Sequence, residues 1–288
     1  MNERRVIALG FFDGVHIGHG ALLKKTCERA TELGAIPAAM SFDTELLNTM
    51  DERKHLMQSL YGIEDVIFCH FDRAMMNMDW EAFVEDYLVR ELHACHLVCG
   101  HDYHFGARGF GNAERLTEKC RALGLGCDVI GEVKLDGVTV SSTHLRALLK
   151  DGKMEEAVRF LGHGHIISGI VQHGDSRGHT LGLPTANLAL DASLLVPAFG
   201  VYGGWADAGE LGRFPAAVNL GVHPTVHELP RPVAEASLLG FDGDLYGKFL
   251  RLELLFQVRP ERQFSSLQEL TAQIARDQQT VFHRLTGV

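Results

Sequence analysis

Glycines and short oxygen-bearing side chains lie close together in one stretch of the second half of the chain. The stretch begins with three glycines at intervals of four residues and a proline, namely Gly174, Gly178, Gly182 and Pro184. Glycines let the backbone approach a ligand closely, and free amide hydrogens in such a turn hold an anion such as phosphate. Thr185 and Asn187 follow, and Mg²⁺ prefers oxygen ligands that complement those of substrate phosphates. These residues predict a site for a nucleotide with Mg²⁺, although a glycine-rich surface loop has the same pattern.

This stretch differs from two common phosphate-binding motifs. It does not end in Gly-Lys-Ser/Thr, as a Walker A loop does. Its glycines follow the spacing GxxxGxxxG, and no long buried strand precedes them, so it is not a Rossmann dinucleotide motif either. The pattern on its own therefore leaves the kind of nucleotide site open.

A second candidate site lies near the N-terminus, where His16 and His19 flank a glycine. The apolar run Val6–Leu9 precedes them and predicts a strand that is buried on both faces of a parallel sheet. Apolar residues at helical spacing follow, from Leu22 to Ala30. Imidazole groups at the start of a helix can hold phosphate oxygens and stabilise the charge on a leaving pyrophosphate. A pair of histidines is more often structural, but this location favours a phosphate site.

Two further groups of polar residues follow predicted strands of the same sheet. Gly100 and Asp102 come directly after an apolar run. Ser141-Ser142-Thr143 comes after a predicted hairpin that turns at Asp136-Gly137, and Arg146 lies on the helix that follows. Ligands of open α/β sheets bind at the carboxyl ends of the strands, so these side chains are candidates for contacts with nucleotide phosphates. The hydroxyl groups have an alternative role as helix caps.

The first half of the chain alternates short apolar runs with helical patterns. The runs are Val6–Leu9, Ala38–Met40, Val66–Cys69, Leu97–Cys99 and Val129–Ile130. Alternation of this kind predicts an open α/β sheet.

The second half changes to short strand-like segments separated by turns, which predicts a small antiparallel β-barrel. The strand candidates are Gly200–Trp205, Ala216–Leu220, Val233–Leu239 and Phe249–Val258. A capping-box pattern at Ser266–Glu269 then begins a final helix. Its predicted face toward the barrel comprises Leu267, Leu270, Ile274 and Phe282. We expect a first domain at 1–150, a linker with the helix Met154–Leu161 at 151–164, and a second domain at 165–288.

The composition is that of an ordinary globular protein, with 46% hydrophobic and 22% charged residues in a chain of 288. The net charge of −10 argues against a nucleic-acid partner, which needs a basic stripe. No apolar run is long enough to span a membrane, and no signal-peptide pattern opens the chain, so we expect a cytoplasmic protein without a membrane partner. The six cysteines lack any CxxC pair, which favours reduced thiols over a zinc site at Cys95, His96 and Cys99.

Three ordered motifs in the first half resemble those of the FMN adenylyltransferase module of bacterial FAD synthetases. They are Gly10-Phe11-Phe12-Asp13-Gly14-Val15-His16-Ile17-Gly18-His19, the run Gly100–Gly106, and Ser141-Ser142-Thr143-His144-Leu145-Arg146. The resemblance implies a nucleotidyltransferase-like fold and attack of the FMN phosphate on the α-phosphorus of ATP, giving FAD and pyrophosphate. It assigns catalysis to His16, His19 and Arg146. The residues that it assigns to ATP and its phosphates are Gly10, Phe12, Asp13, Gly18, Gly100, Asp102, Ser141, Ser142 and Thr143.

This module departs from the family pattern at three places. Phe11 replaces the usual asparagine, and His144 replaces an arginine. Where the family has Phe-x-Pro-His-Pro and a longer loop, this chain has the stretch 41–45 and reaches the next helix sooner. The histidines and Arg146 that would handle phosphate are kept, whereas the surroundings of the flavin differ.

The second half closely resembles riboflavin kinase. The residues that carry this resemblance are 174–187, Gly200-Val201-Tyr202, Asn219-Leu220-Gly221, and Glu235 with 241–247. It implies that the glycine loop, Pro184 and Asn219 bind ATP, and that Thr185 and Asn187 hold Mg²⁺. The resemblance also implies that Glu235 acts as the base for the ribityl hydroxyl of riboflavin. Without the resemblance, the residue pattern favours a glutamate that faces outward from a strand and has no catalytic role. The usual histidine two residues later is Ser237 here.

The two modules together resemble the bifunctional bacterial enzyme that converts riboflavin to FMN and FMN to FAD. Two alternatives remain at this point. The chain could be a riboflavin kinase whose first module is weak or has another substrate, or a flavin-binding regulator without catalytic activity. The oligomeric state is left open.

Overall fold

A computed structural model describes residues 4–44, 47–172, 185–191, 193–223 and 231–287 of the chain. It divides the chain into two compact units, of which the first ends at Ser142 and the second begins at Thr143. The predicted phosphate-binding residues Gly174, Gly178, Gly182 and Pro184 lie outside the described residues. The expected domain boundaries near residues 150 and 165 stay a prediction.

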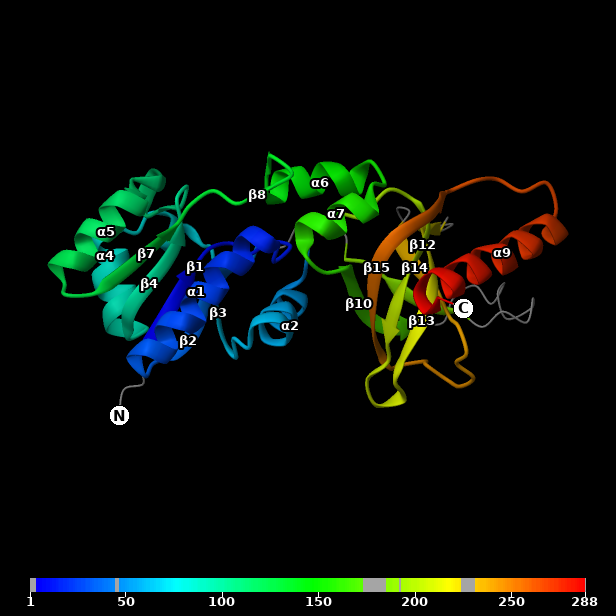
Figure 1. Ribbon diagram of the computed structural model, residues 1–288, viewed down its shortest axis with the longest axis horizontal. Coiled ribbons are helices and arrows are strands. Elements are labelled where there is room, and N and C mark those ends of the chain that lie inside the picture. Colours follow the sequence, from blue (N-terminus) through cyan, green and yellow to red (C-terminus); the bar gives the residue numbers. More distant parts are fainter. Residues whose placement is uncertain (1–3, 45–46, 173–184, 192, 224–230, 288) are drawn as a thin grey trace. The chain divides into compact units, whose positions relative to one another are not determined.

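The first unit contains a five-stranded sheet with the order β3-β2-β1-β4-β7 (Figure 1). Its strands are β1 Arg5–Leu9, β2 Ile36–Phe42, β3 Asp65–Cys69, β4 Ala94–Gly100 and β7 Gly126–Ile130. All four strand pairs are parallel. The central strand β1 is apolar because both of its faces are covered, and Val6 to Leu9 are at most 1% exposed. This confirms the predicted open α/β sheet.

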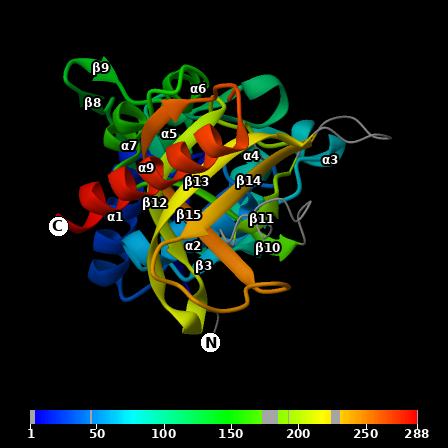
Figure 2. The same ribbon diagram turned by 90° about the vertical axis from the view of Figure 1, so that its right-hand side faces the viewer.

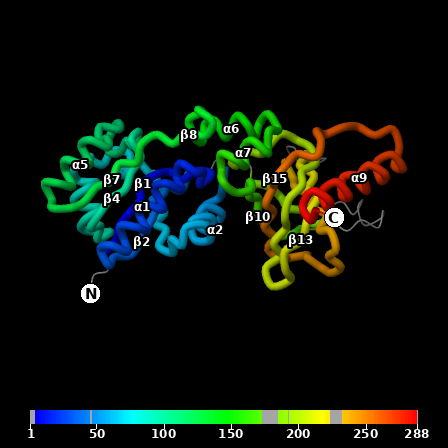
Figure 3. Tube along the Cα trace, viewed as in Figure 1, coloured from blue at the N-terminus to red at the C-terminus, as the bar shows by residue number. Residues whose placement is uncertain are grey.

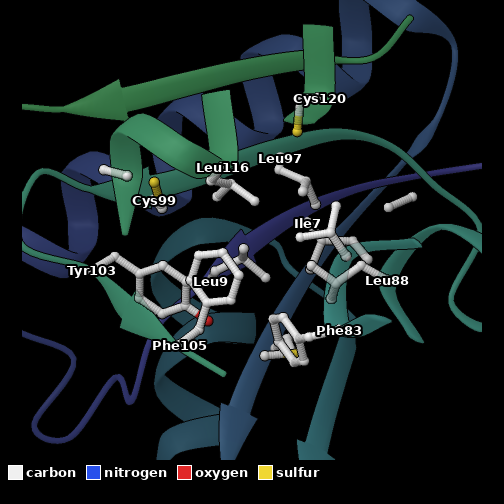
Figure 4. Packing of buried hydrophobic residues seen from close by; sticks show 14 of the residues in the cluster. Ile7, Leu9, Phe83, Leu88, Leu97, Cys99, Tyr103, Phe105, Leu116 and Cys120 are labelled. Atoms are coloured by element: carbon white, nitrogen blue, oxygen red, sulfur yellow. The ribbon is translucent and has the colours of Figure 1, made fainter. Parts of the chain in front are cut away.

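Helices follow the strands, as the alternation predicts. They are α1 Ile17–Leu33, α2 Met50–Tyr61, α3 Arg73–Met76, α4 Trp80–Ala82, the π-helix η1 Phe83–Glu91, the 3₁₀-helix η2 Ala107–Gly109 and α5 Ala113–Ala122. On one face of the sheet, Ile7, Leu9 and Leu97 pack against Phe83 and Leu88 of η1 (Figure 4). The helical segment that begins at Trp80 is mostly π-helical, because η1 directly follows α4.

Two short hairpins complete the first unit. They are β5 His104–Phe105 with β6 Gly111–Asn112, and β8 Lys134–Leu135 with β9 Val138–Thr139. The second hairpin turns where the sequence predicts it. Asp136 and Gly137 have φ angles of 52° and 79°, a left-handed pair that two-residue hairpin turns require.

The second unit contains a closed barrel with the strand order β10-β11-β14-β13-β12-β15, which confirms the predicted antiparallel barrel. The strands are β10 His165–Gln172, β11 Ala186–Ala189, β12 Gly200–Asp207, β13 Arg213–His223, β14 Arg231–Leu238 and β15 Phe249–Pro260. Among the residues that the structure describes, the other elements before the last helix are α6 Ser142–Lys150, α7 Met154–Leu161 and the short η3 Gly209–Leu211. Their order along the chain can be followed by colour in Figure 3.

The last helix, α9 Leu267–Thr286, lies against the barrel strands β12, β13 and β15 (Figure 2). Its start is as predicted, because the Ser266 side chain accepts the amide hydrogen of Glu269. The predicted contact face is partly wrong: Leu267 and Phe282 are 61% and 41% exposed. Val281 and Asp277 are buried instead, so the inner face is rotated from the predicted one. Among the described residues, no helix is both long and apolar enough to cross a membrane.

Candidate active sites

The two histidines of the first unit lie together at the start of α1. His16 is the N-cap of the helix, and its Nδ1 accepts the backbone N–H of His19 at 3.1 Å. The two imidazole rings stack with their centroids 3.6 Å apart and their planes 9° apart. Gly18 lies directly against the His16 ring, and a Cβ there would be 3.1 Å from His16 Nδ1. The spacing His-x-Gly-His thus produces one compact imidazole pair at a helix N-terminus.

The turn between β1 and α1 has an unusual backbone. Phe12 and Val15 have φ angles of 52° and 40°, and Gly14 has 81°. Left-handed conformations at bulky residues are costly and persist only where surrounding contacts hold them. Phe12 and Val15 are both fully buried, and the Phe12 ring lies 5.2 Å from the ring of His19. The turn therefore connects β1 to the histidine pair through strained backbone conformations.

The environment of His19 favours a neutral imidazole. Burial lowers the pKa of His19 well below its ordinary value, and electrostatic interactions with His16 and Arg53 lower this pKa further. The Nδ1 atom of His19 is buried and has no hydrogen-bond partner among the residues that the structure describes. A polar atom left in this state is costly, which makes it a candidate to bind a ligand.

Other predicted residues of this site lie at the same edge of the sheet. Gly10 and Gly100 end neighbouring strands, since Leu9 of β1 pairs with Cys99 of β4. Asp102 is exposed just beyond Gly100. The carboxyl ends of β1 and β4 therefore bring two of the three sequence motifs together.

Asp13 lies beneath the turn rather than on its surface. It is 6% exposed, and its Oδ1 accepts the backbone N–H of Leu47 at 2.7 Å. The Ser142 hydroxyl donates to the Asp13 carbonyl at 2.9 Å, which brings the start of the third motif to the histidine turn. Through these contacts Asp13 links the turn to Leu47 and Ser142, which is a structural role.

The remaining residues of the third motif belong to the second unit. Arg146 donates from Nη2 to Thr143 Oγ1 at 3.1 Å, and both lie on α6. His144, which departs from the family pattern, packs its ring 4.7 Å from that of Phe160 on α7. The role of Arg146 and Thr143 at phosphate stays a prediction from the motif.

Sequence reasoning missed Arg53, which lies under the histidine turn. It is 0% exposed, and its guanidinium donates to the backbone carbonyl of Phe11 at 2.9 Å. In the sequence it looks like one charge among several in Met50–Lys54. A usable signal was its spacing, because Arg53 precedes Leu56 and Met57 by three and four residues and so shares their buried face.

On the barrel, three of the predicted residues form one row. In the strand register Asn187 of β11 pairs with Glu235 of β14, and Glu235 pairs with Asn219 of β13. Directly paired residues point to the same face of a sheet, with Cβ atoms about 4.5–5.5 Å apart. Ala234 and Ala236, which flank Glu235, are 0% exposed, so the row lies on the outer face of the barrel and is half-buried.

This row suits a magnesium nucleotide. Thr185 lies directly before β11, and the side-chain nitrogen of Asn187 donates to the Thr185 carbonyl at 3.4 Å. A threonine hydroxyl, an amide oxygen and the nearby carboxylate of Glu235 are the hard donors that Mg²⁺ prefers, so the residues present fit the ion.

A second carboxylate, missed in the sequence, lies near the same row. A Cβ placed on Gly221 would be 3.6 Å from Asn219 Nδ2 and 3.6 Å from Glu261 Oε1. Glu261 directly follows β15, and its backbone N–H donates to the Phe199 carbonyl at 3.3 Å. The sequence offered little signal for it, because a glutamate at the end of a strand is usually a solvated charge.

Two family models match the chain: FAD synthetase over residues 1–144 and riboflavin kinase over residues 161–285. The bifunctional riboflavin kinase/FMN adenylyltransferase of Bacillus subtilis is 31% identical over 292 residues, covering 96% of this chain and 91% of that protein. The Escherichia coli (strain K12) protein of the same name is 35% identical over 291 residues, with 96% and 92% covered.

Among solved structures, the crystal structure of a macrolide-efflux protein from Streptococcus pneumoniae matches with a TM-score of 0.85 and 25% identity. The match covers 98% of this chain and 94% of that one, which supports both folds described above. The sequence similarity extends over nearly the full length of the curated relatives and includes both modules. The chain belongs to the family of bifunctional riboflavin kinase/FMN adenylyltransferases.

Proposed function

We infer that this protein phosphorylates riboflavin with ATP to give FMN, and that it then adenylylates FMN with a second ATP to give FAD and pyrophosphate. One observation carries this function: the two family matches fall on two units, each with its own candidate site. The stacked histidines occupy the first unit, and the row around Glu235 occupies the second. ATP and the flavins are therefore the substrates and products.

We propose that adenylyl transfer takes place at the histidine pair. A phosphate oxygen of FMN forms a bond to the α-phosphorus of ATP, and the bond from that phosphorus to the bridging oxygen of the leaving pyrophosphate breaks. His16 and His19 hold phosphate oxygens at the N-terminus of α1, whose dipole favours the negative charge. Because His19 is neutral, it contributes a directed hydrogen bond rather than a cation.

The further contacts with ATP in the first site follow from the motifs. The motifs assign Gly10, Gly18 and Gly100 to the nucleotide, because residues without a side chain let a ligand approach the backbone. The side chains assigned to its phosphates are those of Ser141, Ser142, Thr143 and Arg146. Asp102 is assigned to the nucleotide, and Phe12 and Asp13 shape the turn that binds it.

We propose that phosphoryl transfer takes place on the outer face of the barrel. Glu235 accepts the proton of the ribityl hydroxyl as its oxygen bonds to the γ-phosphorus of ATP, and ADP leaves. Thr185 and Asn187 would hold Mg²⁺, which neutralises charge on the phosphates when it is bound. Asn219, Pro184 and the glycines at 174, 178 and 182 are assigned to ATP. The cytoplasmic location that the sequence predicts remains part of this proposal.

Two variants separate the reactions, because each removes one group from one unit. Glu235→Gln is expected to lower FMN formation from riboflavin by about 10²–10⁴-fold, the usual contribution of a general base, and to leave FAD formation from FMN unchanged. His16→Ala is expected to show the reverse, with FAD formation lowered by about 10²-fold. Flavins are resolved by chromatography with riboflavin or FMN supplied as the only flavin.

Exposed residues of the same types provide the matched controls. Glu210→Gln on η3 and His283→Ala on α9 should leave both rates within twofold of wild type. If Glu235→Gln forms FMN at an unchanged rate, Glu235 is not the general base of the kinase reaction. A wild-type protein that binds flavin and forms no FMN would support the regulator instead.

A further inference from the structure

A buried arginine lies beneath the turn that carries the histidine pair. Arg53 projects from α2 and is 0% exposed, which is rare for a guanidinium because its desolvation is costly unless hydrogen bonds compensate. Nη1 donates to the carbonyls of Phe11 and Phe42, both at 2.9 Å, and to Ser41 Oγ at 3.0 Å. Nη2 donates to the Thr44 carbonyl at 2.7 Å. One side chain thus binds two separate segments of backbone.

These contacts converge on the residue that begins the strained turn. The Phe11 carbonyl accepts from Arg53 and also from the Ser41 hydroxyl at 2.7 Å. The next residue, Phe12, has a φ angle of 52°, and its ring packs against His19. Because a left-handed bulky residue persists only where its neighbours fix it, the double anchor on Phe11 is suited to hold the turn.

Arg53 is itself held from other sides. Its guanidinium carbon lies 5.5 Å from the centroid of the Phe68 ring on β3, a cation–π distance. The helix that carries it begins with a capping box, in which the Thr49 side chain accepts from Glu52 N and the Glu52 side chain accepts from the Thr49 backbone. A planar fork fixed in this way can position carbonyl groups, whereas a flexible ammonium cannot match the same set of acceptors.

We propose that Arg53 is a positioning residue of the adenylyl-transfer site, which holds the Phe11–Val15 turn and through it His16 and His19 in the geometry that the reaction needs. This proposal rests on the proposed adenylyl-transfer function. Arg53 does not touch substrate in this account; it acts through the Phe11 carbonyl and the turn.

The charge of Arg53 adds a second effect that can be measured separately. The positive charge of Arg53 opposes protonation of His19, in addition to burial and the interaction with His16. Removal of the Arg53 charge is therefore expected to move the His19 titration to higher pH. A purely steric role for Arg53 would leave that titration unchanged once the turn is intact.

The test uses the full-length protein with Arg53→Met, Arg53→Lys and, as a matched control, Lys54→Met, which removes an exposed cation one residue away on α2. Arg53→Met is expected to lower FAD formation from FMN by about 10²-fold, as a misplaced catalytic group does, and to leave the kinase rate unchanged. In histidine NMR spectra the His19 titration should shift upward. Arg53→Lys should restore that titration and still lose at least about tenfold in rate, because it keeps the charge and lacks the fork.

Several results would overturn the proposal. The proposal is overturned if either Arg53→Met or Arg53→Lys forms FAD at a rate within twofold of wild type. Loss of the folded first unit in both variants would also do so, because Arg53 would then only stabilise the fold. A wild-type protein that forms no FAD would end the adenylyl-transfer function instead, while the His19 titration in the variants would still show whether Arg53 sets the state of the turn.

Discussion

At the scale of single residues, buried polar side chains support the histidine turn, whereas half-buried residues form the row on the barrel. In the first unit, Arg53 and Asp13 are buried and bind backbone groups of the loops around the histidines. In the second, Glu235 stands between two asparagines on the outside of the barrel. Buried polar side chains therefore support the loops around the histidines, whereas strand pairing brings the barrel residues together.

The candidate site residues could be identified from the sequence, whereas the buried residues that hold them in place could not. His16 and His19 were recognisable because a glycine between two histidines follows an apolar strand. Arg53 was missed although its spacing from Leu56 and Met57 places it on their buried face, because the sequence does not show what a buried guanidinium binds. Its partners are backbone carbonyls, and these leave no signature in residue types.

A buried histidine in the barrel predicts a pH dependence of stability. His165 in β10 is 3% exposed, and burial together with the neighbouring His163 lowers its pKa to about 4. In the unfolded chain a histidine has a pKa of about 6.5, so below that pH the unfolded state binds the proton and the folded state does not. The stabilisation is complete above pH 6.5 and is lost as the pH falls toward 4.

Between pH 7 and pH 5 this group is expected to remove about 2 kcal/mol from the free energy of unfolding of the barrel. Urea unfolding followed by Trp205 fluorescence in a Trp80→Phe background reports on the barrel alone. The variant His165→Leu should lose about that part of the pH dependence. An equal pH dependence in both proteins would show that His165 titrates normally in the folded state.

At the scale of elements, the alternation of apolar runs was enough to predict the sheet, and turn signals were enough to predict the barrel. The short strand β11 was missed, because it directly follows the proline-threonine pair and contains only four residues. The inner face of α9 was only partly predicted. Helical periodicity marks apolar residues, whereas this helix buries the charged Asp277 beside Val281.

An ion pair fixes α9 to the barrel and predicts a large effect of one substitution. Arg259 of β15 donates to Asp277 Oδ2 from Nε and Nη2, each at 2.9 Å, and Gln273 donates to Oδ1 at 2.7 Å. The Asp277 side chain is only 5% exposed. Asp277→Ala leaves the guanidinium without its carboxylate and is expected to lower the free energy of unfolding of the barrel by about 3 kcal/mol.

The control for this helix is Arg276→Ala, an exposed neighbour whose side chain contacts Gln273. It should change the free energy of unfolding by less than about 0.5 kcal/mol. Urea unfolding monitored by Trp205 measures both variants. Equal effects of the two substitutions would mean that the ion pair contributes little to the docking of α9.

At the scale of the whole molecule, the two reactions share one compound. FMN is the product of the riboflavin kinase reaction and the substrate of the FMN adenylyltransferase reaction, so one chain provides two consecutive steps. The two motif sets allowed this function to be predicted from the sequence, because each set is ordered and dense. The order of two folds along the chain followed from the change from α/β alternation to short strands near residue 166.

The most direct measurement of this account is a time course with the purified wild-type protein, riboflavin, ATP and Mg²⁺, in which riboflavin, FMN and FAD are separated by chromatography and pyrophosphate is measured in parallel. The account predicts that FMN forms first and then declines as FAD accumulates, with one pyrophosphate released for each FAD. FMN that accumulates without any FAD or pyrophosphate would contradict the bifunctional activity, and the absence of both products would contradict the enzymatic function as a whole.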